Sequence, residues 1–260
     1  MFASDLMTFN ASFQALLGGR YVWYKARNLS ATALPQDKNV FVPTGALIYR
    51  PREEVMTYAS YSRGFEKGDY APYNAINANQ PTDAIQSEQI EIGLKAELGT
   101  VWTLGVAAFD IKRDASYLDT DNTYVSNGRF HHRGVELNTS AVLGSRWTLV
   151  GNAAYLDTEL VDVTDAATRG RRTEGVPRWK SALTARYRLL AVPGLSVDGT
   201  WAYVGSRAVD AQNSGFVPGY ATWDAGATFQ THVNGVPARF RLYAKNLTNQ
   251  YYYPGVYYSG

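Results

Sequence analysis

Few side chains in this sequence are spaced for covalent or metal chemistry. His131 and His132 are adjacent, so on a strand they point to opposite faces and cannot hold one metal ion together. Asp119, Asp121 and Asn122 begin like a calcium-binding loop, but the glycine and the final glutamate of such a loop are missing. The absence of cysteine excludes disulfides and cysteine-ligated metals. We therefore expect no enzyme, no catalytic residue and no metal site.

The sequence is instead organised by segments with a period of two, which is the period of a β-strand. In residues 88–98, Ile90, Ile92 and Leu94 fall on one face, while Glu91 and Lys95 fall on the other. Several segments alternate in this way, and their polar faces carry many ionised side chains. Two further segments, 55–65 and 102–113, alternate poorly and are candidates for a β-bulge. The predicted strands are residues 14–28, 40–50, 55–65, 87–98, 102–113, 129–143, 147–160, 179–190, 195–205, 221–231 and 238–247.

The connectors between these strands alternate between short and long. The short ones are residues 51–54, 99–101, 144–146, 191–194 and 233–237, and the long ones are residues 29–39, 66–86, 114–127, 161–178 and 206–219. A soluble sandwich has no reason to sort its loops in this way. An outer-membrane barrel does, because it has short periplasmic turns and long extracellular loops.

Composition agrees with a membrane barrel. Trp102, Trp147, Trp179 and Trp223 lie near predicted strand ends, where an interfacial aromatic girdle is expected. No apolar run reaches about 18 residues, so no transmembrane helix is predicted. The formal net charge of +2 gives no argument for a nucleic-acid partner. The predicted fold class is all-β, an antiparallel transmembrane β-barrel portion, and a soluble all-β binding module is the alternative.

Five short motifs, in order along the chain, support a more specific comparison. They are FVPTGALIYRP at residues 41–51, YASYSRGF at 58–65, SEQIEIGLK at 87–95 after Pro81, RGVEL at 133–137 and KNLTNQYY at 245–252. Together they resemble the C-terminal half of the barrel of a TonB-dependent receptor, in the branch that binds siderophores. The resemblance covers residues 41 to 260.

This resemblance implies a barrel of about 22 strands around a plug domain. Residues 1–260 would then be a partial barrel domain with about 11 of those strands, lacking the plug and the last strand. The sequence begins without a secretion signal, which agrees with a chain that lacks its own N-terminus.

The function implied is energy-coupled uptake of a ferric siderophore across the outer membrane of a Gram-negative bacterium. The partners implied are the siderophore, the TonB complex acting through the missing plug, and the lipid and lipopolysaccharide of that membrane. Iron would enter only as part of the ferric siderophore, so no other cofactor is expected. The alternatives are TonB-dependent uptake of haem, cobalamin or a saccharide, and a passive porin-like barrel.

A siderophore already wraps its iron, so its receptor needs stacking surfaces and hydrogen-bond donors rather than metal ligands. The candidate ligand-binding residues, all in loops, are Tyr70, Tyr73, Tyr117, Tyr124, Arg171, Phe216 and Tyr220. Arg169, Arg171 and Arg172 form a basic cluster that could attract an anionic chelate. A further aromatic group, for which a girdle role is the alternative, comprises Tyr251, Tyr252, Tyr253, Tyr257 and Tyr258.

Charged ladders along the predicted strands are interpreted as salt bridges of a hydrated lumen wall that holds the plug, in preference to direct ligand contacts. They comprise Glu88, Glu91, Lys95, Glu136, Arg186, Arg188, Arg239, Arg241 and Lys245.

Overall fold

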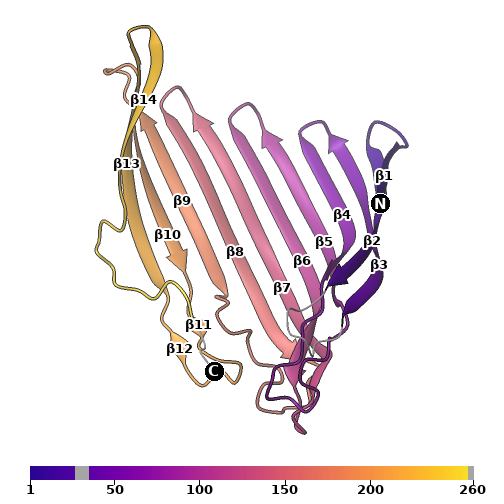
Figure 1. Cartoon of the computed structure of the whole chain (residues 1–260). Coiled ribbons are helices and arrows are strands. Elements are labelled where there is room, and N and C mark those ends of the chain that lie inside the picture. Colours follow the sequence, from indigo (N-terminus) through magenta and orange to yellow (C-terminus); the bar gives the residue numbers. More distant parts are fainter. Residues whose placement is uncertain (27–34, 257–260) are drawn as a thin grey trace.

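The computed structural model describes residues 1–26 and 35–256. Within them the chain forms a 12-stranded antiparallel sheet in which each strand pairs with the next one along the sequence. A small second sheet, β11–β12, lies between β10 and β13 in the sequence. The large sheet curls into an open trough, with β1 and β14 as its two ends (Figure 1). None of the described residues forms a helix that could cross a membrane.

The strands of the large sheet are β1 (Phe2–Thr8), β2 (Phe13–Ala26), β3 (Gln36–Arg52), β4 (Val55–Glu66), β5 (Ile85–Leu98), β6 (Trp102–Leu118), β7 (Tyr124–Leu143), β8 (Trp147–Val161), β9 (Trp179–Arg188), β10 (Leu195–Val204), β13 (Tyr220–Val233) and β14 (Val236–Ala244). The small sheet pairs β11 (Arg207–Ala208) with β12 (Phe216–Val217).

All eleven predicted strands are present, and β1 is an additional one. This strand pairs with β2 over seven residues, from Phe2 with Arg20 to Thr8 with Gln14. Its side chains do not sort cleanly by polarity, because Asp5 shares a face with Met7. The period-two pattern that reveals the other strands is therefore missing from β1.

The connector predicted for residues 114–127 is wrong for most of its length. β6 and β7 continue as a paired hairpin to Leu118 and Tyr124, with a register shift between Ala115 and Tyr117. β7 is 20 residues long, about twice the length that a membrane-spanning strand needs. The hairpin therefore projects well beyond the membrane on the loop side.

Short and long connectors lie at opposite ends of the sheet, as the sequence predicts (Figure 1). Two of the turns have only two residues, Glu53–Glu54 between β3 and β4 and Asn234–Gly235 between β13 and β14. Asn234 and Gly235 have φ of 53° and 80°. An Asn-Gly pair adopts these left-handed angles readily, and the resulting turn matches the twist of a hairpin. The predicted connector 29–39 lies partly outside the described residues.

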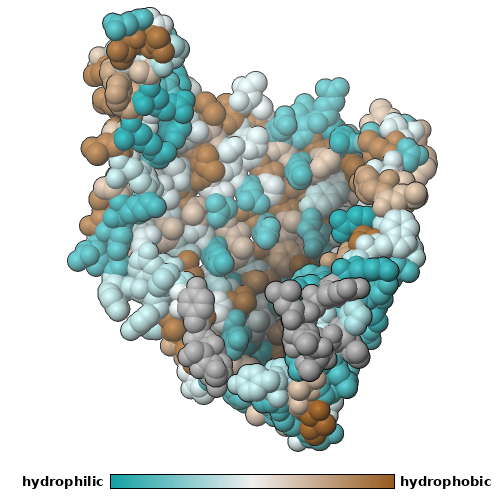
Figure 2. Space-filling model, viewed as in Figure 1, coloured by the Kyte–Doolittle hydropathy of each residue, from teal (hydrophilic) through white to brown (hydrophobic). Residues whose placement is uncertain are grey.

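The polarity of the sheet is inverted relative to a soluble protein. Its outer face exposes large apolar side chains, including Leu47 (66% exposed), Ile90 (60%) and Leu242 (77%). Alternate residues such as Glu91 and Lys95 point to the inner, concave face, over which hydrophilic residues are scattered (Figure 2). Apolar side chains turned outwards and polar ones turned inwards are expected when lipid surrounds a wet lumen.

Two aromatic belts bound the apolar part of the outer face. Trp147 and Tyr187 pack at 4.7 Å near the turn end, and Tyr155 and Trp179 pack at 4.8 Å nearer the loop end. These positions confirm the predicted girdle.

Directly beyond the loop-end belt, the outer face becomes charged. Val135 and Tyr155 are paired across β7 and β8 and form one row on the outer face. Two residues further towards the loop end, Asp110, Arg133 and Asp157 form the next row across β6, β7 and β8. Cross-strand contacts join this row to its neighbours: His131 contacts Asp110 at 2.9 Å, and Arg178 contacts Asp157 at 2.9 Å. On β6 to β8 the outer face therefore changes from apolar and aromatic to charged within one residue step, whereas on β5 the residue level with Asp110 is the exposed Ile90.

Glycines on the inner face make room for aromatic rings from the neighbouring strand. A Cβ at Gly134 would lie 2.4 Å from the Phe109 ring and 2.6 Å from the Tyr155 carbonyl oxygen. A Cβ at Gly93 would meet the Tyr58 ring at 2.4 Å. These close approaches explain why glycine interrupts otherwise continuous strands.

We expect Gly134→Val to destabilise the barrel by about 1–3 kcal/mol, because the added side chain collides with a ring and with backbone. Gly105→Val is the matched control on the same face, since the nearest atom to its Cβ would be the Asn138 carbonyl oxygen at 3.9 Å. The temperature at which the protein loses its folded, heat-modifiable gel migration measures both variants. Equal midpoints for the two would show that the contact at Gly134 is not limiting.

Candidate ligand-binding site

The predicted ligand-binding residues all lie at the loop end of the sheet, and the structure divides them between two groups. One group involves the segment 67–84 and the β6–β7 hairpin. The other involves the segments 162–178 and 205–219 together with the stretch that follows β14. A hydrogen bond of 3.2 Å from the Thr164 amide to the Tyr117 hydroxyl links the two groups.

In the first group, the segment 67–84 is fastened to the β6–β7 hairpin. The Asn77 side chain donates to the Tyr124 carbonyl and accepts from the Tyr124 amide, both at 2.9 Å. The Ile76 amide donates to the Asn122 carbonyl at 3.0 Å. At the base of the segment, the buried Gln36 side chain donates to the Gly68 carbonyl at 2.9 Å. The loop is therefore an ordered wall of the site.

The four predicted tyrosines of this group have different environments. Tyr73 is 93% exposed and available to a ligand. The hydroxyl of Tyr70 is buried without a hydrogen-bond partner among the described residues. Tyr117 is tied to Thr164, and burial raises the pKa of Tyr124 above its ordinary value. Only Tyr73 of these four presents its ring freely to solvent.

The predicted basic cluster is divided by the structure. Arg169 turns back onto its own loop and donates to the Val163 carbonyl at 3.0 and 2.7 Å. Arg172 donates to the Ser206 carbonyl at 3.0 Å, and burial lowers its pKa. Arg171 is exposed and makes one long bond, of 3.3 Å, to the Ala167 carbonyl. Arg171 is thus the member best placed to meet an anion in solution.

The second group contains an arginine that sequence reasoning missed. Arg207 is 4% exposed, and it donates to the carbonyls of Pro254 (2.8 Å) and Tyr253. Its guanidinium carbon lies 5.9 Å from the Tyr220 ring, which stacks on Tyr252 at 4.0 Å. A lone arginine in a loop has no distinctive pattern, whereas the neighbouring tyrosines do.

Arg172 and Phe216 complete this arrangement, with the guanidinium 5.3 Å from the ring and the ring 48% exposed. We call Arg172, Arg207, Phe216, Tyr220 and Tyr252 the aromatic–arginine cluster. The Nε atoms of both arginines are buried without a hydrogen-bond partner among the described residues. The exposed Phe216 ring beside the Arg172 guanidinium can stack on a planar ligand and attract its negative charge, while buried Arg207 holds the tyrosines behind it.

The remaining predicted aromatics differ in their placement. Tyr251 is 79% exposed and packs edge-on against Tyr253 at 5.6 Å. Tyr257 and Tyr258 lie outside the described residues.

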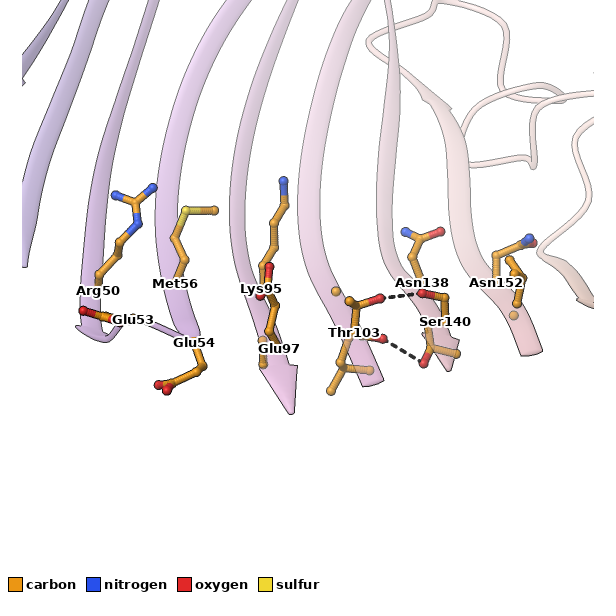
Figure 3. Close-up of a pocket in the computed structure, with 16 residues that line it drawn as sticks. Arg50, Glu53, Glu54, Met56, Lys95, Glu97, Thr103, Asn138, Ser140 and Asn152 are labelled. Atoms are coloured by element: carbon orange, nitrogen blue, oxygen red, sulfur yellow. Dashed lines mark hydrogen bonds between the residues drawn. The ribbon is translucent and has the colours of Figure 1, made fainter. Parts of the chain in front are cut away.

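A hollow of about 620 Å³ lies on the inner face at the opposite, turn end of the sheet (Figure 3). Lys95, Glu97 and Asn138 contribute to it, and the Thr103 and Ser140 hydroxyls share a hydrogen bond of 2.7 Å at its floor. None of the predicted ligand-binding residues lines it. The hollow is therefore part of the wall of the trough and separate from the loop-end site.

The charged ladders are inward-facing with one exception. Glu91 accepts hydrogen bonds from the Tyr58 hydroxyl at 2.5 Å and from Gln89 at 2.9 Å on the inner face. Glu88 instead shares the outward phase of Ile90 and pairs with Arg63. Among the described residues, no group of three or more histidine, cysteine or acidic side chains could hold a metal ion.

The inverted polarity, the aromatic belts and the sorted connectors define an outer-membrane β-barrel protein. A family model described as TonB dependent receptor-like, beta-barrel, matches residues 1–247. The chain belongs to this family, whose barrels lie in the outer membrane of Gram-negative bacteria.

Sequences and structures similar to this chain include siderophore receptors, in agreement with this family assignment. The chain is 29% identical to the ferrichrome receptor FcuA of Yersinia enterocolitica over 84% of its length, and 28% identical to the ferrichrome outer membrane transporter/phage receptor of Escherichia coli over 91%. It covers 29% and 32% of those proteins. The crystal structure of BauA, the ferric preacinetobactin receptor of Acinetobacter baumannii, matches 96% of this chain with a TM-score of 0.85 and 31% identity. The chain covers 38% of that structure, so it spans about a third of the length of these relatives.

We expect Arg207→Gln to loosen the segment 245–256, because two backbone carbonyls lose a buried, charged donor. The free energy of local opening should fall by about 2 kcal/mol. Hydrogen exchange of the amides in this segment measures the change, and Arg171→Gln is the exposed control. Similar exchange in both variants would contradict the role assigned to Arg207.

Proposed function

We propose that this chain forms part of the wall and ligand site of a receptor that takes up a ferric siderophore across the outer membrane. The observation that carries the proposal is the aromatic–arginine cluster at the loop end of a barrel wall. Its rings and guanidinium groups suit a bulky chelate whose iron is already fully coordinated. The names of the relatives, which include receptors for ferrichrome and ferric preacinetobactin, support the same substrate class.

In this proposal, residues 1–260 supply about half of a barrel whose plug domain lies elsewhere in the receptor. The ligand binds between Tyr73 and Arg171 on the loops and the aromatic–arginine cluster beside them. The TonB complex then draws on the inner-membrane proton gradient and acts through the plug. The protein needs no resident cofactor, because iron arrives inside the siderophore, and it has no catalytic role. Lipid and lipopolysaccharide surround its outer face.

The relatives named above include receptors for ferrichrome and for ferric preacinetobactin, which are 29% and 31% identical to this chain. Ligand choice therefore belongs to loop residues, while the barrel strands provide a shared frame. The exposed members Tyr73, Arg171 and Phe216 are the positions at which we expect specificity to be set.

The function is tested by expressing the receptor in a Gram-negative strain that lacks its own siderophore receptors. Uptake of radioactive iron should occur from at least one chelate in a panel of hydroxamate, catecholate and carboxylate siderophores. It should stop when the proton gradient is collapsed. Failure with all three chelate classes, in cells that display the folded receptor, would contradict the proposal.

The site is tested with Phe216→Ala and Tyr220→Ala. Each should weaken binding of the transported chelate by about 1 kcal/mol, roughly fivefold in Kd, through loss of a stacking surface. Phe240→Ala is the control, because this ring is 57% exposed on the outer face of the sheet. An equal loss of affinity in the control would remove the cluster from the site.

A further inference from the structure

The inner face of β9 and β14 carries a row of cations. Lys180, Arg186 and Arg188 alternate with the outward-facing residues of β9, and Arg239 and Arg241 alternate with those of β14. Lys245 continues the same alternation one residue after β14. We call Lys180, Arg186, Arg188, Arg239, Arg241 and Lys245 the cationic stripe.

The strand register places the four arginines of this stripe on successive levels of the wall, and Lys180 lies three levels above Arg186. Arg186 lies level with Asp198, Gly226 and Tyr243. Arg188 and Arg241 share the next level towards the turn end, and Arg239 follows one level further. Because two residues of a strand advance by about 7 Å, neighbouring levels lie within reach of one arginine side chain.

Two carboxylates face this stripe among the described residues of β9, β10, β13 and β14, and neither cancels it. The Asp198 side chain is 3% exposed, lies 3.9 Å from Arg186 Nε and 3.6 Å from Arg241 Nη2, and has an Oδ1 atom without a hydrogen-bond partner. Asp224 is occupied by the Tyr243 hydroxyl at 2.9 Å and the Asn246 amide at 2.7 Å. The Arg186 and Arg241 side chains remain half exposed, at 52% each.

The opposite part of the wall is closer to an equal number of cations and carboxylates. The inner face of β2 to β7 carries Glu66, Glu91, Glu97 and Glu136 against Arg20, Lys38, Arg50, Lys95 and Arg113. The inner face of β8 between these regions has no charged residue. The excess of cations over carboxylates is therefore larger on the β9–β14 side of the described wall than on the β2–β7 side.

The upper end of the stripe meets the aromatic–arginine cluster. Lys180 pairs in register with Val204, and Val204 pairs with Tyr220, a member of the cluster. The level directly below Lys180, formed by Ala182, Ala202 and Thr222, carries no cation. Lys245 follows beside Asp224, and the arginines of β9 and β14 continue from there to the turn end. A fixed partner at one height would need cations at that height alone, whereas a moving anion would use cations at several heights.

We propose that the cationic stripe guides an anionic ferric chelate from the aromatic–arginine cluster along the β9–β14 wall to the periplasmic end. This inference rests on the proposed function and adds to it the sign of the substrate's charge and its route. An acidic protein surface docked on the stripe is the competing occupant. With that occupant, loss of the stripe would lower the stability of the receptor and would slow the uptake of charged and uncharged chelates alike.

The test uses the receptor with Arg186→Gln, Arg188→Gln and Arg241→Gln combined, and a second receptor with lysine at the same three positions. Lys95→Gln is the control on the inner face. The probes are ferric citrate, which is anionic, and ferrichrome, which is uncharged. Binding is measured on cells whose proton gradient is collapsed, and the initial rate of uptake is measured on energised cells.

We expect the glutamine variant to take up ferric citrate about tenfold more slowly, because the field that concentrates the anion is lost. Its Kd for ferric citrate should change less than twofold, and the lysine variant should recover most of the rate. Ferrichrome uptake, where it occurs, and the Lys95→Gln control should be unaffected.

An unchanged ferric citrate rate would overturn the inference. Equal losses for both chelates, with a lowered heat-modifiability midpoint, would overturn it in favour of a docked polypeptide. A parent receptor that transports ferrichrome but not ferric citrate would also overturn it, since the inference commits to an anion. A parent receptor that transports no chelate of any class contradicts the proposed function itself.

Discussion

The structure depends on one constraint, which is that backbone amides and carbonyls inside a lipid layer must find their partners within the protein. The antiparallel ladder meets this demand by pairing each strand with its sequence neighbours, from Phe2 opposite Arg20 at one end to Val233 opposite Val236 at the other. With the ladder fixed, the period of two assigns every side chain to lipid or lumen. Polarity, girdles and the inward-facing charges are all consequences of this single register.

Most of the sheet could be predicted because its strands carry that period openly. Ile90, Ile92 and Leu94 fall outwards in the sequence and in the structure alike. β1 was not predicted because Asp5 interrupts its apolar face. Its backbone pairing with β2 holds it in the sheet. The extension of β6 and β7 was not predicted for a different reason. Above the membrane neither face of a strand is in lipid, so apolar and polar residues need not alternate there.

The candidate site was predictable in composition but not in geometry. Exposed tyrosines and a run of arginines stand out in the sequence, and the loop end is where they gather. Contacts between distant segments decide which arginine faces solvent and which donates to a backbone carbonyl. One such contact joins Asn213 to Arg172, which lie 41 residues apart in the sequence. Arg207 illustrates this best, because its partners Tyr253 and Pro254 lie 46 and 47 residues away.

The abrupt change on the outer face, from the row of Val135 and Tyr155 to the row of Arg133 and Asp157, has a mechanical consequence. Sinking the barrel by one residue step would immerse a row of ion pairs in hydrocarbon, and raising it would lift aromatic rings out of the headgroup layer. The barrel therefore sits at one depth and resists tilting on this side. A force applied from the periplasm to a part inside the lumen would therefore move that part relative to the wall, because the membrane holds the wall at its depth.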